Sequence, residues 1–475
     1  MRQETRNKGQ TIRIWNTLTG KKEPLPVRKG KPLRLFVCGP TVYDRTHIGH
    51  LRTYIFFDFF AKYLRSCGYA VTYLQNITDI DDKIIRRAKE RGEKPLALSA
   101  RLTKEYLRDM SAFGADAVDT YAAATKFIPE IAGQVERLAA KGAAYKIESD
   151  GYYFDVAQFP GYGKLSRRTA AQAEDAVSRI DDSLGKRNKG DFCLWKFSKP
   201  GEPVWNSPLG AGRPGWHIED TAISEHFFGP QYDVHGGGLD LKFPHHEAEI
   251  AQQEAASGKV PFVKLWMHTG MLTVRGEKMS KSLGNFITAR DFLSNHSPAA
   301  FRFLSLSHHY RTPLDYEEKL VRAAEETLEG IRQFLGKLSF VETRTLKKFS
   351  KRLSLPAHAR AWEAALADDV NTPKALASLF ELIRTAYSVI WKLDPRSTRA
   401  LRDFLISRLA LLGIAFSLPK VPANIKEYAG EREVFRKRQQ FVQSDALRKK
   451  IEALGYMVED TPAGPFLWPK KRSTK

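Results

Sequence analysis

The chain has 475 residues, of which 42% are hydrophobic, so it is long enough for about two to four globular domains and too apolar to be disordered. No apolar stretch approaches the ~20 residues that cross a bilayer, and Met1–Arg6 lacks the apolar core of a signal peptide. Three cysteines are too few for a disulfide framework in a chain of this length. We therefore expect a cytoplasmic protein without membrane contact. Lys and Arg outnumber Asp and Glu by 76 to 54, and the net charge of +22 favours a polyanionic partner such as nucleic acid over a merely solvated basic surface.

The first part of the chain alternates between strand and helix patterns. Two apolar strands, each followed by a helix, within about 60 residues indicate a βαβ unit and hence a parallel sheet. The expected elements are an edge strand and turn at 11–30, buried strands at 33–37 and 70–77, a helix from Ile48, a charged helix through Arg91, and helical patterns over 99–142.

The turn between the first buried strand and its helix contains His47, Gly49 and His50. The opening of a helix presents free backbone N–H groups and binds anions. Gly49 leaves room for a nucleotide, and the two imidazoles can donate hydrogen bonds to phosphate oxygens. A His-x-Gly-His tetrapeptide by itself also occurs in ordinary turns.

A second group of chemical side chains follows a polar stretch that we interpret as an insertion at 143–198. A run of three glycines follows His235. Pro244 is then expected to start a helix on which His245 and Glu249 share one face, at a spacing that suits metal ligands. The same pair could merely interact with the helix dipole. Cys38 ends the first buried strand and can face the same crevice, because ligands of open α/β sheets collect beyond the carboxyl ends of strands.

A loop at 276–285 places Lys278 and Lys281 between glycines. Such a loop can close over a triphosphate, and its lysines can neutralise a departing pyrophosphate. A solvated turn is the alternative.

The last third of the chain is helical and basic. Amphipathic patterns at 320–338 and 357–393 suit a helical bundle. The positive excess extends into residues 421–475, where we expect Trp468 to be available for stacking on an unpaired base.

His-Ile-Gly-His at 47–50 and Lys-Met-Ser-Lys-Ser at 278–282 resemble the two signatures of class I aminoacyl-tRNA synthetases, in the expected order. Further blocks narrow the resemblance to the cysteinyl-tRNA synthetases, and it spans nearly the whole chain. These blocks are Cys38–Asp44, Gly215–Glu219, the glycine triplet with Pro244–Glu247, Gly276–Asn285, Asn371–Pro373 and Asp460–Pro462.

The resemblance implies an α/β fold: a Rossmann-like parallel-sheet catalytic domain with an insertion, then an α-helical bundle and a small C-terminal anticodon-binding domain. The expected parts are the two catalytic halves at 1–142 and 201–270, the insertion at 143–200, the Lys-Met-Ser-Lys-Ser loop and stem-contact region at 271–318, the tRNA-binding bundle at 319–420, and the anticodon-binding domain at 421–475.

The resemblance also implies the reaction, in which cysteine and ATP give cysteinyl-adenylate and the cysteinyl group then passes to tRNA(Cys). We expect a monomer that uses ATP with Mg²⁺. By position, the implied catalytic residues are His47, His50, Lys278 and Lys281, and the implied residues that bind ATP or the amino acid are Thr41, Gly49, Trp216, Gly237, Asp240 and Lys281.

The family further implies one zinc ion held by two cysteines, a histidine and a glutamate, which selects the substrate thiolate over a serine hydroxyl. Cys38, His245 and Glu249 match three of these ligands. The fourth position carries Asp220 in place of the family's cysteine, and we expect its carboxylate to complete the site.

Alternatives stay open for Asp220 and for the function. Asp220 could cap a helix at Thr221 or satisfy His217. The chain could instead activate cysteine for a non-tRNA amine acceptor such as a sugar, or it could be an inactive RNA-binding regulator. The intact tail disfavours the first of these, and the intact histidines and lysine loop disfavour the second.

Overall fold

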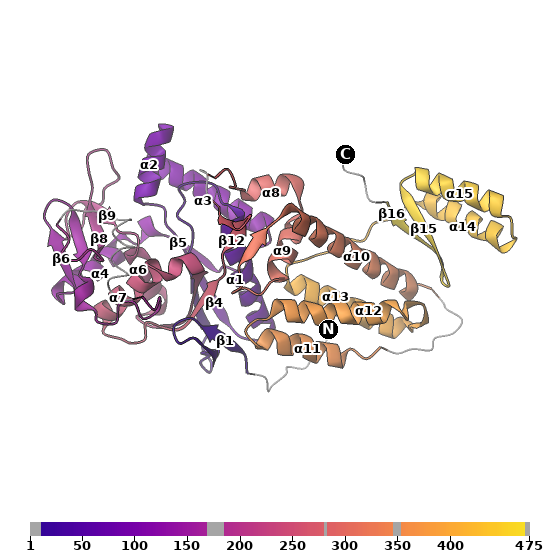
Figure 1. Cartoon of the computed structure of the whole chain (residues 1–475), viewed down its shortest axis with the longest axis horizontal. Helices are drawn as coiled ribbons and strands as arrows, with labels where there is room; N and C mark the ends of the chain where they lie inside the picture. The colour runs from indigo at the N-terminus through magenta and orange to yellow at the C-terminus, as the bar shows by residue number, and fades with distance from the viewer. Residues whose placement is uncertain (1–10, 169–184, 280–282, 345–352, 471–475) are drawn as a thin grey trace. The chain divides into compact units, whose positions relative to one another are not determined.

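The computed structural model describes residues 11–168, 185–279, 283–344 and 353–470 (Figure 1). The chain divides into two compact units. The first consists of Met1–Glu318 with Ala365–Thr372, and the second of Lys319–Ala364 with Pro373–Lys475.

A five-stranded parallel sheet with the order β11-β10-β3-β4-β5 forms the centre of the first unit. Its strands are apolar and largely buried, as expected where both faces of a sheet are covered. The Rossmann-like parallel sheet predicted from the sequence is therefore confirmed. The strands are β3 (Leu33–Val37), β4 (Val71–Ile77), β5 (Thr120–Ala123), β10 (Tyr232–Gly238) and β11 (Val263–Thr269).

The strand β5 corrects the continuous helical pattern expected over 99–142. Its four residues pair in parallel with β4 at the edge of the sheet. This pairing, which depends on tertiary structure, decides the conformation of a segment too short to show a strand period.

Helices surround this sheet, and α1, with 19 residues, is the longest of them. Its apolar residues occupy nearly the whole circumference and include Phe56, Phe57, Phe59 and Phe60, so the helix lies in the interior. The helices of this unit are α1 (Ile48–Ser66), α2 (Asp82–Arg91), α3 (Pro95–Ala112), α4 (Ile128–Ala140), α6 (Ile218–Phe228), α7 (His245–Ser257), α8 (Ala289–Asn295) and α9 (Pro298–Leu306), with short 3-10 helices η1 (Ala124–Lys126), η2 (Val156–Gln158) and η3 (Leu239–Lys242).

The predicted insertion contributes β6, β7 and β8 to a separate antiparallel sheet with the order β6-β7-β8-β9, and β9 extends this sheet beyond the predicted end at residue 200. Phe154 and Trp195 of this sheet share a buried cluster with Ile131 of α4, Ile218 of α6 and Ala248 of α7, so the sheet packs against these three helices. Its strands are β6 (Ala144–Ile147), β7 (Gly151–Phe154), β8 (Phe192–Phe197) and β9 (Gly212–Pro214).

Two small sheets complete the first unit. The hairpin of β1 (Arg13–Asn16) and β2 (Lys21–Pro24) matches the expected edge strand and turn. A sheet with the order β13-β12-β14 leads into the lysine loop; it contains β12 (Leu272–Val274), β13 (Glu277–Lys278) and β14 (Leu314–Tyr316).

The segment Ala365–Thr372 belongs to the first unit although the chain on both sides of it belongs to the second. Its Asp369 carboxylate accepts hydrogen bonds from the Trp15 backbone N–H at 2.9 Å and the Tyr310 hydroxyl at 2.8 Å. The same carboxylate pairs with Arg311 at 2.7 Å. These contacts fix the segment in the first unit.

The second unit is mainly helical, as the sequence predicts. Its last part has its own core of Ile425, Ala429, Ile451 and Val458. The elements are α10 (Glu318–Glu342), α11 (Pro356–Ala367), α12 (Thr372–Tyr387), η4 (Ile390–Lys392), α13 (Pro395–Leu411), α14 (Ala423–Lys437), α15 (Phe441–Ala453), and a hairpin of β15 (Tyr456–Thr461) and β16 (Gly464–Pro469).

The expectation that Trp468 is available for base stacking is wrong. The side chain is only 5% exposed, and its indole N–H donates to Glu329 of α10 at 2.9 Å. A Cβ atom at Gly336 of α10 would lie 2.3 Å from the indole ring, so this glycine makes room for the ring. Trp468 therefore anchors the hairpin to α10.

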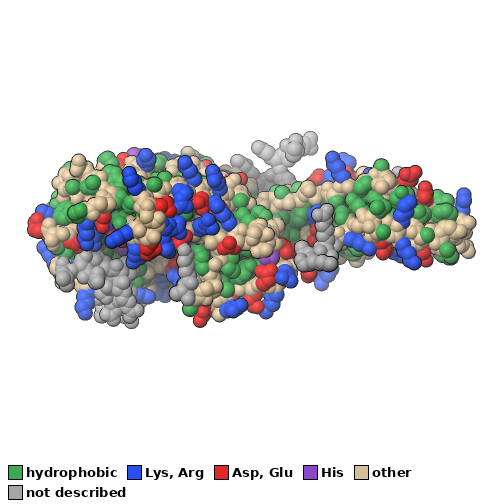
Figure 2. Space-filling view, turned by 90° about the horizontal axis from the view of Figure 1, so that it is seen from above, with side chains coloured by type: hydrophobic (Ala, Val, Ile, Leu, Met, Phe, Trp, Pro, Cys, Tyr) green, Lys and Arg blue, Asp and Glu red, His purple; other side chains and the backbone are tan. Residues whose placement is uncertain are grey.

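The surface carries many Lys and Arg side chains, interspersed with Asp and Glu (Figure 2). No described helix combines the length and the apolar character needed to cross a membrane.

Candidate active site and metal centre

Cys38 lies directly after β3, at the carboxyl edge of the parallel sheet. Its backbone N–H donates to the Gly236 carbonyl of β10 at 3.0 Å, and its side chain is buried. The next residue, Gly39, lies against β4: an added Cβ would be only 1.7 Å from the Asn76 carbonyl oxygen. The Gly39 N–H donates to the Asn76 side chain at 2.6 Å, which fixes the turn that aims Cys38.

The structure brings together the four side chains that the sequence analysis names as metal ligands. Their possible ligand atoms all lie within 4.8 Å of one another, and all four side chains are buried. Asp220 Oδ2 lies 3.0 Å from Cys38 Sγ and 3.1 Å from His245 Nε2. Glu249 Oε1 lies 3.2 Å from His245 Nε2 and 3.7 Å from Cys38 Sγ.

Asp220 has neither of the two structural roles considered as alternatives. The helix α6 begins at Ile218 with His217 in the capping position, so Asp220 is inside the first turn and does not cap a helix at Thr221. The His217 ring faces the His245 ring, Nδ1 to Nδ1 at 2.8 Å, while Asp220 contacts Nε2 of His245. Asn76 donates to the second oxygen of Asp220.

The electrostatics of this cluster favour a bound cation. Burial and the neighbouring Asp220 carboxylate raise the pKa of Cys38 and of Glu249 well above their ordinary values. Glu249 Oε2 has no hydrogen-bond partner among the described residues, and no described Lys or Arg pairs with Asp220 or Glu249. A divalent cation would relieve the repulsion between these anionic groups, and one sulfur, one imidazole and two carboxylates are all accepted zinc ligands.

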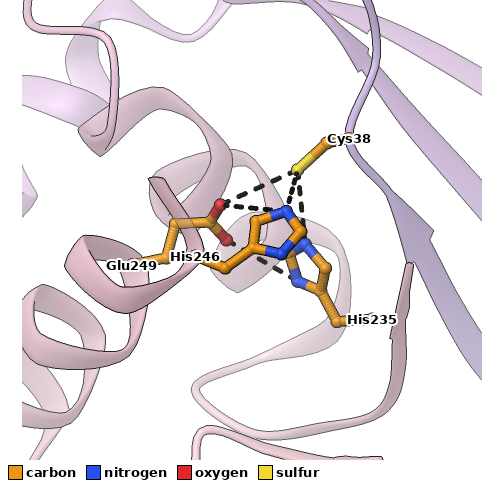
Figure 3. A group of neighbouring side chains, drawn as sticks. All are labelled: Cys38, His235, His246 and Glu249. Carbon is orange, nitrogen blue, oxygen red and sulfur yellow. Dashed lines mark hydrogen bonds and ion pairs between the residues drawn. The ribbon is translucent and has the colours of Figure 1, made fainter. Parts of the chain in front are cut away.

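Two further histidines, His235 and His246, face the same cysteine from its other side (Figure 3). Their Nε2 atoms lie 3.3 Å and 3.1 Å from Cys38 Sγ. Both side chains are fully buried. The sequence analysis missed them as possible ligands; the available signals were the tandem His245-His246 and the position of His235 in the strand beside Cys38.

The residues expected to contact ATP lie at the start of α1. His47 caps this helix, and its Nδ1 accepts from the Gly49 N–H at 3.2 Å. The His47 and His50 rings lie 3.8 Å apart, and both line a narrow crevice with Thr41. Burial lowers the pKa of His47 to about 2 and that of His50 to about 4, so both rings are neutral near pH 7.

Gly49 is packed tightly rather than open. An added Cβ would lie 2.7 Å from the terminal methyl of Met279 and 2.9 Å from the His47 ring, so a larger residue would force these side chains to move. Lys278, which precedes Met279, pairs with Asp240 at 3.4 Å. Lys281 lies outside the described residues.

Trp216 and Gly237, which are also expected to bind ATP or the amino acid, both contact histidines of the protein itself. Trp216 stacks on the His245 ring, with centroids 4.5 Å apart, and so lies beside the group of possible metal ligands. A Cβ at Gly237 would lie 2.7 Å from the His246 ring, so this glycine makes room for a histidine of the protein itself.

The chain matches known proteins over most of its length. Residues 25–326 match the model of the tRNA synthetases class I (C) catalytic domain, and residues 361–417 match the DALR domain. A cysteine–tRNA ligase of Thermococcus onnurineus is 42% identical over 97% of this chain and 99% of its own length. A cysteine–tRNA ligase of Pelotomaculum thermopropionicum is 41% identical over 97% of this chain and 100% of its own length.

The chain belongs to the cysteine–tRNA ligase family.

The family resemblance expected from the sequence is thereby confirmed. The similarity to these cysteine–tRNA ligases extends through the C-terminal third of this chain. It does not support a non-tRNA acceptor. A solved methionyl-tRNA synthetase of Mycobacterium tuberculosis, in complex with methionyl-adenylate, has the same fold with a TM-score of 0.59 at 16% identity, over 80% of this chain and 89% of its own.

Proposed function

We propose that the chain ligates cysteine to tRNA(Cys) in two steps. The carboxylate of cysteine attacks the α-phosphate of ATP, which forms cysteinyl-adenylate and releases pyrophosphate. A hydroxyl of the terminal ribose of tRNA(Cys) then attacks the cysteinyl carbonyl, which forms the ester and releases AMP. Similarity to cysteine–tRNA ligases over 97% of the chain supports this assignment.

One observation from the structure supports the assignment most directly. Cys38, Asp220, His245 and Glu249 converge at the end of β3, and the same strand leads within ten residues into the helix that carries His47 and His50. Cys38, one of the proposed metal ligands, and the helix start proposed to bind phosphate therefore lie on one stretch of chain. This arrangement suits an enzyme that activates an amino acid with a thiol side chain.

His47 and His50 are proposed to bind the phosphates of ATP. Each neutral ring carries one N–H and can donate one hydrogen bond to a phosphate oxygen. Lys278 and Lys281 are proposed to neutralise the leaving pyrophosphate, with Mg²⁺ bound to ATP. In the structure Lys278 is held by Asp240, so ATP would replace this partner.

Thr41 and Trp216 are proposed to line the pocket for the cysteine backbone and side chain, and Gly237 and Asp240 to border the adenosine. Cys38, Asp220, His245 and Glu249 would hold the metal. Zinc, when bound there, would offer a coordination position that a thiolate fills more firmly than a serine hydroxyl does.

The rest of the chain is proposed to serve tRNA. The bundle at 319–420 would contact the tRNA and the part at 421–475 the anticodon, with the basic excess of the chain attracting the phosphate backbone. We propose a cytoplasmic monomer. The boundaries of these parts follow the sequence analysis.

Pyrophosphate exchange dependent on an amino acid tests this function. Cysteine should support exchange, and serine should support it about 10⁴–10⁵ times less well in kcat/KM, the scale on which a site built around a specific polar contact rejects an analogue that cannot make it. tRNA(Cys) transcripts should then accept cysteine. Exchange with cysteine but no charging of tRNA(Cys) would contradict the proposed ribose hydroxyl acceptor and favour a non-tRNA amine.

A further inference from the structure

The cluster around Cys38 contains two overlapping sets of possible metal ligands. The outer set consists of Cys38, Asp220, His245 and Glu249, and the inner set of Cys38, His235, His246 and Glu249. The neighbours His245 and His246 of α7 therefore point their Nε2 atoms into different sets, while Cys38 and Glu249 belong to both. Figure 3 shows the inner set, with the four side chains converging between β3, β10 and α7.

The spacing of the donor atoms fits one ion in either set. A tetrahedral zinc ion, with Zn–N of about 2.0 Å and Zn–S of about 2.3 Å, separates its donors by roughly 3.3–3.6 Å. The outer separations given above run from 3.0 Å to 3.7 Å. In the inner set, Cys38 Sγ lies 3.1 Å from His246, 3.3 Å from His235 and 3.7 Å from Glu249, and His246 lies 4.0 Å from Glu249.

The two inner histidines are oriented as metal-binding histidines are. A histidine ligand is normally held by a hydrogen bond at its other ring nitrogen. His246 Nδ1 is held by His268 at 2.8 Å, and His235 Nδ1 by the Tyr232 hydroxyl at 2.6 Å. In both rings the remaining nitrogen, Nε2, faces Cys38.

The donor atoms of the two sets differ in a way that makes the inner one competitive. The outer set offers one sulfur, one imidazole nitrogen and two carboxylate oxygens, whereas the inner set offers one sulfur, two imidazole nitrogens and one oxygen. Zinc is a borderline-soft ion for which imidazole and thiolate are at least as suitable as carboxylate. The second imidazole of the inner set therefore compensates for the longer His246–Glu249 separation, and the two sets should bind zinc with comparable affinity.

The surroundings of the two sets also differ. The outer histidine, His245, stacks on the partly exposed Trp216. The inner histidine, His235, stacks on Trp266 with centroids 4.3 Å apart, and Trp266 is only 1% exposed. The outer position therefore lies beside a partly exposed side chain, whereas the inner position lies against a fully buried one.

We propose that this chain holds one metal ion that divides between two overlapping positions, a sealed inner one and an outer one that the substrate thiol can reach. Both positions would use Cys38 and Glu249, and with one ion per chain only one position is filled at a time. Binding of cysteine shifts the ion outward, because only the outer position can accept its thiolate. This inference rests on the metal site of the proposed function.

X-ray absorption at the zinc edge of the wild-type protein tests the proposal without any substitution. The outer position contributes one imidazole ligand and the inner position two, so without cysteine the average number of imidazole ligands per zinc should lie between one and two, at one zinc per chain. Saturating cysteine should lower this average number toward one and add one sulfur ligand. A single imidazole in the absence of cysteine, or two zinc ions per chain, would overturn the proposal.

Cobalt titration of variants provides a second measurement. Asp220→Ala and His246→Gln should each still bind one Co²⁺, about two- to tenfold more weakly than the wild type and with visible spectra that differ from each other. The double variant should bind Co²⁺ more than about a hundredfold more weakly, because in each single variant the intact position compensates for the damaged one. His226→Gln, on the exposed face of α6, is the matched control and should leave the spectrum unchanged. A His246→Gln protein with the wild-type spectrum and affinity would refute an inner position.

Cysteine-dependent pyrophosphate exchange, measured on the same wild-type sample, separates this inference from the proposed function. Exchange together with a single-imidazole site would leave the enzyme assignment intact and reject the second position. Absence of exchange would reject the assignment itself.

Discussion

Substitution of Gly39 by alanine should strongly impair cysteine activation without unfolding the chain. The added Cβ would lie 1.7 Å from the Asn76 carbonyl oxygen, and real Cβ atoms essentially never approach a neighbour closer than 3.0 Å. The backbone at Gly39 must therefore move away from β4 by at least 3.0 − 1.7 = 1.3 Å. No side chain can relieve this overlap, because the obstacle is the backbone of a central strand.

This displacement is transmitted directly to the site. Cys38 is the preceding residue, and the Gly39 N–H holds the Asn76 side chain that in turn donates to Asp220. A misplacement of about 1 Å at a reacting centre commonly costs about 10² in rate, so kcat/KM for cysteine in pyrophosphate exchange should fall by roughly 10² or more. Metal affinity should fall as well, since Cys38 and Asp220 move relative to each other.

Gly133→Ala is the matched control for this experiment. Gly133 lies in α4, where an added Cβ meets nothing within 4 Å, and alanine in a helix interior is favoured over glycine by about 0.5–1 kcal/mol. The control should keep full exchange activity and equal or greater stability. The reasoning about Gly39 would be refuted if Gly39→Ala retained exchange within about threefold of the control at equal metal content.

Three further substitutions or titrations test other parts of the structure. Lys281→Ala should lower adenylate formation by about 10²–10³ while leaving the circular dichroism spectrum unchanged, because one charge donor to the leaving pyrophosphate is lost. His47 and His50 should stay neutral in ¹⁵N-histidine NMR down to about pH 5, since their pKa values are lowered from 6.5 to about 2 and about 4. Because the folded chain then binds fewer protons than the unfolded chain below pH 6.5, these two residues should make stability decrease as the pH falls through that range. Trp468→Ala should lower the free energy of urea unfolding of the second unit by about 3–5 kcal/mol, because a buried indole and its hydrogen bond to Glu329 are removed.

Each of these expectations has a clear contrary result. Exchange near the wild-type rate in Lys281→Ala would exclude a role for this lysine in the transition state. Imidazole resonances that titrate near pH 6.5 would mean that His47 and His50 are solvated rather than buried. An unfolding midpoint unaffected by Trp468→Ala would mean that the indole does not anchor the hairpin.

The parts of the fold that local chemistry determines could be predicted from the sequence. The apolar run before Cys38, the break at Gly39-Pro40 and the helix from Ile48 are each encoded within a few residues, and the structure has β3, the turn and α1 in these places. The convergence of Cys38 with the face of α7 that carries His245 and Glu249 could be predicted too. The reason is that a strand's carboxyl end and the start of a helix at the same sheet edge must lie close together.

The parts that tertiary packing determines could not be predicted in the same way. Thr120–Ala123 becomes a strand by pairing with β4, and its two strand-favouring residues followed by two alanines do not by themselves decide between strand and helix. Trp468 near a basic tail is typical of a nucleic-acid contact, but its burial depends on the space that Gly336 leaves on α10. A buried histidine such as His235 has the same sequence signal whether it packs in a core or faces a thiol.

Because the chain leaves the first unit after Glu318 and returns to it at Ala365–Thr372, no uninterrupted piece of the sequence consists of this catalytic unit alone. A protein truncated after Glu318 would keep the sheet, the histidines and the metal cluster but would lose Asp369. The guanidinium of Arg311, the hydroxyl of Tyr310 and the backbone N–H of Trp15 would then lose the carboxylate that they share. Isolation of a working catalytic unit would require the eight-residue segment to be supplied again, as a separate peptide or by a shortened connection in place of the helices that precede it.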